Sequence, residues 1–201
     1  MKKLYSLLFA FTVILASCST DSEEAYEGLE EKNFTVDASY EDLTGKSGTQ
    51  TCAVTTIIAD ETIIAGKVYA ESDGDNLIIT FVTDTSWMID VTNLYIGSEN
   101  EIPTWSSGVP RTSHFPYRAT HGPGVNKVVY SIPLTDITDD CFAVLGHAIV
   151  TKYTESGNPI YCTNSWINGK QVVSSSWAMK TSMCKSGCKL TRKPQPVIEV
   201  R

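Results

Sequence analysis

The sequence predicts an all-β protein, folded as a single β-sandwich of about eight strands. From about residue 50 onward, β-branched and aromatic residues occur in short runs separated by turn signals. Outside the N-terminal residues, no stretch carries a convincing helical pattern. The range 49–190 is long enough for one hydrophobic core and too short for two.

The first half of this range contains four predicted strands. Runs of strand-forming residues cover 53–58, 62–71, 77–83 and 87–96. The second and third runs flank Asp73-Gly74-Asp75-Asn76, and such a turn between two alternating runs predicts a β-hairpin.

The segment between Gly97 and Asn126 changes to Pro, Gly, Ser, His and aromatic residues. A connection of this length is uncommon in a compact domain unless it is functional or packs on itself. We therefore expect a binding surface here first.

Strand character returns at 127–132 and becomes nearly continuous apolar sequence over 141–153, as expected for a central strand buried on both faces. Runs over 160–167 and 171–179 flank Asn168-Gly169, the strongest short hairpin signal in the chain. The residues over 191–201, which include two prolines, predict an extended tail.

The chain begins with the three parts of an export signal, which we assign to residues 1–17. Its apolar run over 4–16 is shorter than the roughly 20 residues that a helix needs to cross a bilayer. Leu15-Ala16-Ser17-Cys18 resembles the lipobox of bacterial lipoproteins, which implies cleavage after residue 17 and acylation of Cys18. Several acyl chains on one residue would anchor the protein stably to a membrane. An ordinary secretory signal with a nearby cysteine is the alternative.

Residues 18–48 hold nine acidic residues against Lys32 and Lys46. This composition predicts a flexible, disordered acidic tether between the lipid and the domain. The run Ser19-Thr20-Asp21-Ser22-Glu23-Glu24 resembles the export tag of Bacteroidota lipoproteins, which implies the outer membrane and its outer face. A plain solvated spacer is the alternative. The acidic balance argues against nucleic acid as a partner, because such partners need clustered Lys and Arg.

Five cysteines follow Cys18, and an exported location permits disulfides. They are Cys52, Cys141, Cys162, Cys184 and Cys188. Because five is odd, at most two bonds form among them and one thiol is left over. Cys184 with Cys188 and Cys141 with Cys162 are candidate pairs, although the sequence does not fix the connectivity. Zinc held by Cys162, Cys184, Cys188 and a histidine is an alternative that the missing C-x₂-C spacing disfavours.

Short motifs between residues 65 and 150 are similar to a β-rich domain that recurs in secreted bacterial proteins. They include Phe115-Pro116-Tyr117 and Gly146-His147-Ala148. The resemblance implies a secreted β domain and no particular activity.

No convincing catalytic set is present in the sequence. His147 lies in the most apolar strand, where a hydrogen-bonded structural histidine is the favoured interpretation. His114 and His121 could approach each other around a metal, but no H-E-x-x-H motif supports this, and we expect no metal or cofactor. A glycosidase needs two carboxylates across a sugar. The candidates near the long loop are Asp84, Asp90, Glu99 and Glu101.

Aromatic side chains provide flat apolar faces with polar tips, which sugars and protein partners both use. Most of them are expected to fill the core. Trp105 is the exception, because the loop-like sequence Pro103-Thr104-Trp105-Ser106-Ser107-Gly108 would leave its indole partly exposed. With His114, Tyr117 and His121 it forms the candidate binding set.

The sequence therefore favours a membrane-anchored, non-catalytic β-sandwich that presents a loop surface to a glycan or to another protein. Two other functions stay open. One is a small hydrolase that uses Asp90 or His114, and the other is a structural subunit of an envelope assembly.

Overall fold

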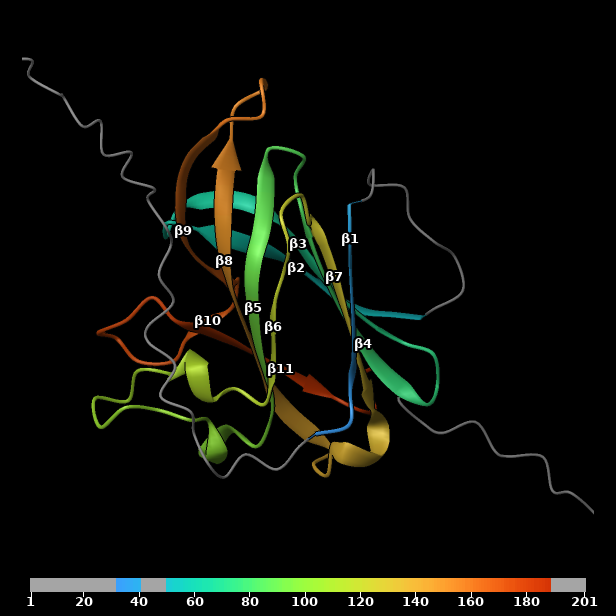
Figure 1. Cartoon of the computed structure of the whole chain (residues 1–201). Helices are drawn as coiled ribbons and strands as arrows, with labels where there is room; N and C mark the ends of the chain where they lie inside the picture. Colours follow the sequence, from blue (N-terminus) through green and yellow to red (C-terminus); the bar gives the residue numbers. More distant parts are fainter. Residues whose placement is uncertain (1–31, 41–49, 189–201) are drawn as a thin grey trace, which may run out of the picture.

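The computed structural model describes residues 32–40 and 50–188, which form one antiparallel sheet of eleven strands curled into a nearly closed barrel (Figure 1). The strands are β1 (Thr35–Ser39), β2 (Gln50–Ala59), β3 (Ile63–Ser72), β4 (Asn76–Thr83), β5 (Trp87–Gly97), β6 (Tyr117–Thr120), β7 (Lys127–Pro133), β8 (Cys141–Tyr153), β9 (Pro159–Ile167), β10 (Lys170–Gln171) and β11 (Met179–Cys184). Three short 3₁₀ helices interrupt the connections, namely η1 (Glu99–Glu101), η2 (Thr112–His114) and η3 (Leu134–Asp136). No α-helix occurs among the described residues.

The prediction of an all-β fold is confirmed, but the strands form one continuous sheet where a sandwich would have two. The sheet runs in the order β1-β7-β4-β3-β2-β9-β8, and β5 and β6 continue it beyond β8. The strand count exceeds the expected eight because β1, β6 and β11 were not anticipated from the sequence. The β3–β4 hairpin is confirmed, and its turn is closed by two backbone N–H groups that donate to Asp73 Oδ1.

The long strand β8 joins the parts of the sheet. One edge pairs with β5 along its whole length, while the other edge pairs with β11 near Cys141 and with β9 nearer Tyr153. Its side chains alternate as strands require. Val144 and Val150 point into the barrel core, whereas Leu145 and His147 point outward. The prediction that this strand is central and buried on both faces is confirmed.

Side chains fill the interior of the barrel. The largest of them come from five strands and are fully buried, and they include Leu77, Ile79, Phe81, Ile89, Leu94, Tyr117 and Tyr130. Small barrels of this kind are packed by their own residues and do not enclose a large ligand. The barrel is therefore a scaffold, and a ligand site is expected on its outside or at its ends.

The two outer strands of the sheet, β1 and β6, are joined by side chains and not by backbone pairing. Phe34, next to β1, packs edge-on against Tyr117 of β6 with ring centroids 5.2 Å apart, and it stacks on Tyr130 of β7. The Tyr130 hydroxyl lies 2.6 Å from Thr92 Oγ1 on β5, inside the barrel. These contacts hold the seam of the barrel nearly closed.

Strand β1 lies inside the range 18–48 for which the composition predicted a disordered tether, so that prediction is wrong for residues 35–39. The strand forms because it pairs antiparallel with the free edge of β7, and because Phe34 and Val36 pack on the core. Long-range pairing of this kind leaves no signal in local composition. The expected signal peptide over 1–17, Cys18 with the rest of the tether, and the tail over 191–201 lie outside the described residues.

The predicted hairpin at Asn168-Gly169 is also wrong. β9 pairs with β8 and β2, whereas β10 pairs with β11. Gly169 lies against the backbone of β11, where a Cβ atom would come within 2.2 Å of the Lys180 carbonyl oxygen. The glycine therefore serves a close backbone approach. As a result most of the predicted strand over 171–179 is a loop.

Two disulfides join cysteines of the described residues to one another, and both differ from the pairs suggested by the sequence. The expected leftover thiol is not found among the described cysteines, because none of them is free. Cys141 is bonded to Cys184 across the β8–β11 pair, and Cys52 is bonded to Cys188. The β8–β9 register places Cys162 opposite Thr151, about 30 Å along the strand from Cys141. Cys184 and Cys188 therefore cannot bind zinc in the alternative site, because each is in a disulfide and a disulfide sulfur is not a thiolate.

Loss of the Cys52–Cys188 bond is expected to destabilise the fold strongly. The bond spans 136 residues, and closing so long a loop removes much of the entropy of the unfolded chain. The variant Cys52→Ala/Cys188→Ala should lose about 3–5 kcal/mol in the free energy of unfolding, measured by urea denaturation. Cys141→Ala/Cys184→Ala, with a separation of 43, should lose about 1 kcal/mol less. An unchanged urea midpoint in the first variant would contradict this role.

Candidate functional site

The segment between β5 and β6 folds into a rigid loop on the outside of the barrel (lower left in Figure 1). Its tip is a small hairpin in which Thr104 bridges to Pro110 and the Trp105 N–H donates to the Val109 carbonyl at 2.8 Å. Gly108 occupies a turn position with φ +82°, a conformation that favours glycine. The base is fixed by the Arg111 N–H, which donates to the Pro103 carbonyl.

The inner side of this loop packs on a second, smaller apolar cluster. Phe115 is fully buried there against Tyr95 and Trp166, from strands β5 and β9. Ala178 and Trp177 of the segment before β11 complete the cluster. The loop is thus packed on itself and on the barrel wall, so its outer residues are held in fixed positions.

Trp105 is exposed, as predicted, with 53 % of its surface accessible. The guanidinium carbon of Arg111 lies 4.1 Å from the centre of its ring, a cation–π contact. The Arg111 Nε atom is screened from solvent and donates to no acceptor in the described part of the chain. Arg111 therefore covers one face of the indole, while more than half of the Trp105 surface stays accessible.

Two further basic side chains lie beside this pair. Arg118 is exposed on β6, and its Nη1 donates to the Ser113 carbonyl at 2.5 Å. Burial lowers the pKa of His114, and the positive charges of Arg111 and Arg118 lower it further. The His114 N–H donates to the Arg111 carbonyl, and Arg118 binds the carbonyl of Ser113 between them, so all three residues lie at η2. Trp105, Arg111, His114 and Arg118 are called the loop platform below.

The other two predicted binding residues do not join the platform. Tyr117 begins β6 with its side chain inside the barrel and is only 1 % exposed. Burial, with a smaller contribution from the charge of Asp136, raises its pKa to about 12. His121 follows the far end of β6, where its Nε2 lies 2.7 Å from Thr92 Oγ1.

A metal between His114 and His121 does not fit this arrangement. Strand β6 separates the two residues by about 20 Å. Within residues 32–40 and 50–188, no three His, Cys, Asp or Glu side chains cluster as metal ligands would.

His147 is a structural residue, as its apolar strand predicted. It is 5 % exposed on the outer face of β8, between Asn93 Nδ2 at 3.1 Å and Asn164 Oδ1 at 3.0 Å. With the amides in these orientations, the His147 Nδ1 accepts a hydrogen bond from Asn93 and the Nε2–H donates one to Asn164. The single lone pair of the neutral ring is therefore already engaged. Burial lowers its pKa to about 4. The ring is therefore neutral near pH 7.

The candidate carboxylates lie at opposite ends of β5. Asp90 is half-buried near the start of the strand, where burial raises its pKa and the Thr151 hydroxyl donates to it at 2.6 Å. Glu99 follows the other end, paired with Lys180. Nine strand residues span about 30 Å, whereas glycosidase carboxylates stand roughly 5–9.5 Å apart. These two carboxylates therefore do not form such a pair.

A groove of about 820 Å³ lies at the end of the barrel opposite the platform, between the connections that follow β4, β6 and β8. At its rim, Lys152 Nζ lies 2.6 Å from Ser86 Oγ and 4.9 Å from the centre of the Trp87 ring. The remaining lining residues are Thr85, Met88, Pro123, Gly124, Tyr153, Thr154, Glu155 and Gly157. Sequence reasoning missed this groove because it draws on three separate turns.

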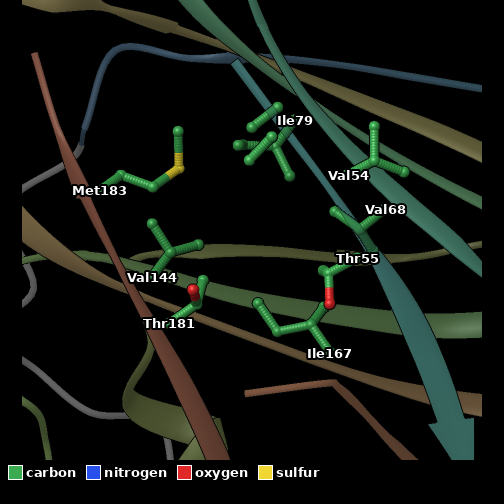
Figure 2. Close-up of a pocket in the computed structure, with 10 residues that line it drawn as sticks. Val54, Thr55, Val68, Ile79, Val144, Ile167, Thr181 and Met183 are labelled. Atoms are coloured by element: carbon green, nitrogen blue, oxygen red, sulfur yellow. The ribbon is translucent and has the colours of Figure 1, made fainter. Parts of the chain in front are cut away.

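A smaller pocket of about 190 Å³ opens through the barrel wall between β2 and β11 (Figure 2). Thr181 and Met183 of β11 face Val54 and Thr55 of β2 across it, and its floor is formed by core residues such as Ile79. The pocket is mostly apolar and lacks a charged group.

Comparisons with models of known protein families, with curated proteins and with solved structures find no match to this chain. No helix within residues 32–40 and 50–188 is long and apolar enough to cross a bilayer.

The buried neutral His147 makes stability depend on pH. Its pKa is about 4 in the folded protein against 6.5 for an ordinary histidine, so the unfolded state binds more protons between these values. The free energy of unfolding should be constant for this group above pH 6.5 and fall by about 3 kcal/mol as the pH drops toward 4.

Urea denaturation at pH 7.5 and pH 4.5 measures this effect. The variant His147→Gln lacks the titrating ring and should lose that part of the pH dependence, while every other group is unchanged. Equal pH dependence in the two proteins would show that His147 is not held neutral.

Proposed function

We propose that this chain is a lipid-anchored binding protein of the bacterial outer membrane that captures a glycan on the loop platform without chemical turnover. The observation that carries the proposal is Trp105, an indole more than half exposed and held in place by a rigid hairpin and by Arg111. A flat, fixed aromatic face with nearby polar donors is a suitable surface for stacking a sugar ring.

The surroundings of Trp105 favour a small polar ligand over a large protein partner. A stable protein interface buries about 800 Å² on each partner around a central apolar cluster. The other large exposed apolar side chains lie elsewhere, on β2, β3 and β9 or beside β1. Among the described residues, Trp105 is thus the one large exposed apolar side chain of this loop, and its neighbours carry basic and hydroxyl groups. Such surroundings are typical of sugar recognition.

Rigidity supports the same conclusion. The Trp105 N–H donates to the Val109 carbonyl, and the Trp105 carbonyl accepts from the Gly108 N–H. Phe115 anchors the loop to the outer cluster. A preorganised ring loses little conformational freedom when a ligand stacks on it. Neutral His147 and the separation of Asp90 from Glu99 support binding without hydrolysis.

The anchoring part of the proposal rests on the lipobox-like sequence ending at Cys18, and the two disulfides fit an oxidising compartment outside the cytoplasm. Mass spectrometry of the native protein should find an acylated N-terminal peptide that begins at Cys18. An unmodified thiol at this residue, or cleavage at another bond, would contradict the anchor.

Glycan binding is tested with the full chain in detergent on a glycan array, followed by calorimetry with the best ligand. Trp105→Ala should weaken binding by at least about tenfold, because the stacking face is lost. Trp105→Phe, which keeps a flat ring, should lose less. Tyr161→Ala removes another exposed aromatic, 39 % accessible on β9, and should leave affinity unchanged.

The bound glycan should be recovered at its original length after prolonged incubation. Absence of binding to any glycan, or binding that Trp105→Ala leaves intact, would refute the platform as the site. A shortened glycan would refute the non-catalytic role.

A further inference from the structure

We infer that the loop platform selects acidic sugars, with the carboxylate or sulfate group of the ligand held by the N–H donors of Arg118 and attracted by the positive charge of Arg111. This inference rests on the proposed function and names the chemical class of the glycan. It follows from the charges around Trp105 and the donors that they leave available.

The platform is a basic site on an acidic protein. The chain carries a formal net charge of −7, yet Arg111 contacts Trp105 and Arg118 binds the carbonyl of Ser113, two residues along the chain from Arg111. Within the described residues neither arginine forms an ion pair. Of the two acidic residues of η1, Glu99 is paired with Lys180, and Glu101 forms no ion pair with either arginine. The positive charge at this end is therefore available to a ligand.

The donors of the two guanidinium groups suit an anion. Each guanidinium carries five N–H donors in a planar fork that matches a carboxylate or sulfate with two parallel hydrogen bonds. Arg118 uses one nitrogen on the Ser113 carbonyl, and its exposed position leaves the others open to solvent. The guanidinium carbon of Arg111 lies 4.1 Å from the centre of the Trp105 ring, so an acidic sugar stacked on the other face of the indole lies within range of its positive charge.

His114 limits the charge of the platform to the arginines. Burial, and then the two neighbouring guanidinium groups, hold its pKa below the usual value, so its ring is neutral at pH 7. The combination of a stacking ring, neutral hydrogen-bonding groups and two cations matches an acidic sugar better than a neutral one.

The test compares acidic and neutral ligands on the full chain in detergent. Oligogalacturonate supplies carboxylates, a heparin oligosaccharide supplies sulfates, and oligogalacturonate with its carboxyl groups reduced to alcohols is the matched neutral ligand. At least one acidic ligand should bind about tenfold more tightly than the neutral one, and added salt should weaken it. The acidic ligand that binds identifies the group.

Arg118→Gln should weaken the acidic ligand by about tenfold and leave the neutral ligand unchanged. Lys67→Gln makes the same charge change at an exposed position on β3 and should alter neither. Equal binding of acidic and neutral ligands, or an acidic ligand insensitive to Arg118→Gln, would overturn this inference and leave the proposed function standing. Binding of no saccharide at all would overturn both.

Discussion

The tightly filled interior of the barrel is the constraint on which the rest of the structure depends. Aromatic and branched side chains from most of its strands meet there with almost no exposure, and Tyr130 and Phe34 extend the packing across the seam. Because this space is occupied, the barrel holds no large ligand inside. In the proposed function, recognition therefore falls to the ends of the strands and to the loop that the outer cluster around Phe115 holds against the barrel wall.

The parts of this fold that local sequence encodes were predictable. The turn at Asp73-Gly74 and the apolar run of β8 carry their signals in neighbouring residues, and both are as expected. β1 and the segment after Asn168 were not predictable, because distant partners decide them. Residues 35–39 are a strand only beside β7, and Gly169 follows the backbone of β11 and not a hairpin.

The residues of the candidate site were also predictable only in part. The exposure of Trp105 follows from its Pro-, Gly- and Ser-rich neighbours, and the sequence predicts it. Tyr117 is not exposed with Trp105, because the four-residue strand β6 begins there and the alternation of its side chains turns the ring into the barrel. Arg111 and Arg118 enter the proposed site only because the folded loop brings Arg111 onto the indole and Arg118 onto the Ser113 carbonyl, and no spacing in the chain marks them.

The central claim is that ligand binds on the outer loop and not in the barrel or its opposite groove. Backbone amide chemical shifts of the full chain, followed by NMR during titration with the acidic oligosaccharide, test it most directly. If the ligand binds on the loop platform, the largest changes fall within residues 103–118. Changes centred instead on the groove around Ser86 and Lys152, or on the pocket between β2 and β11, would contradict it.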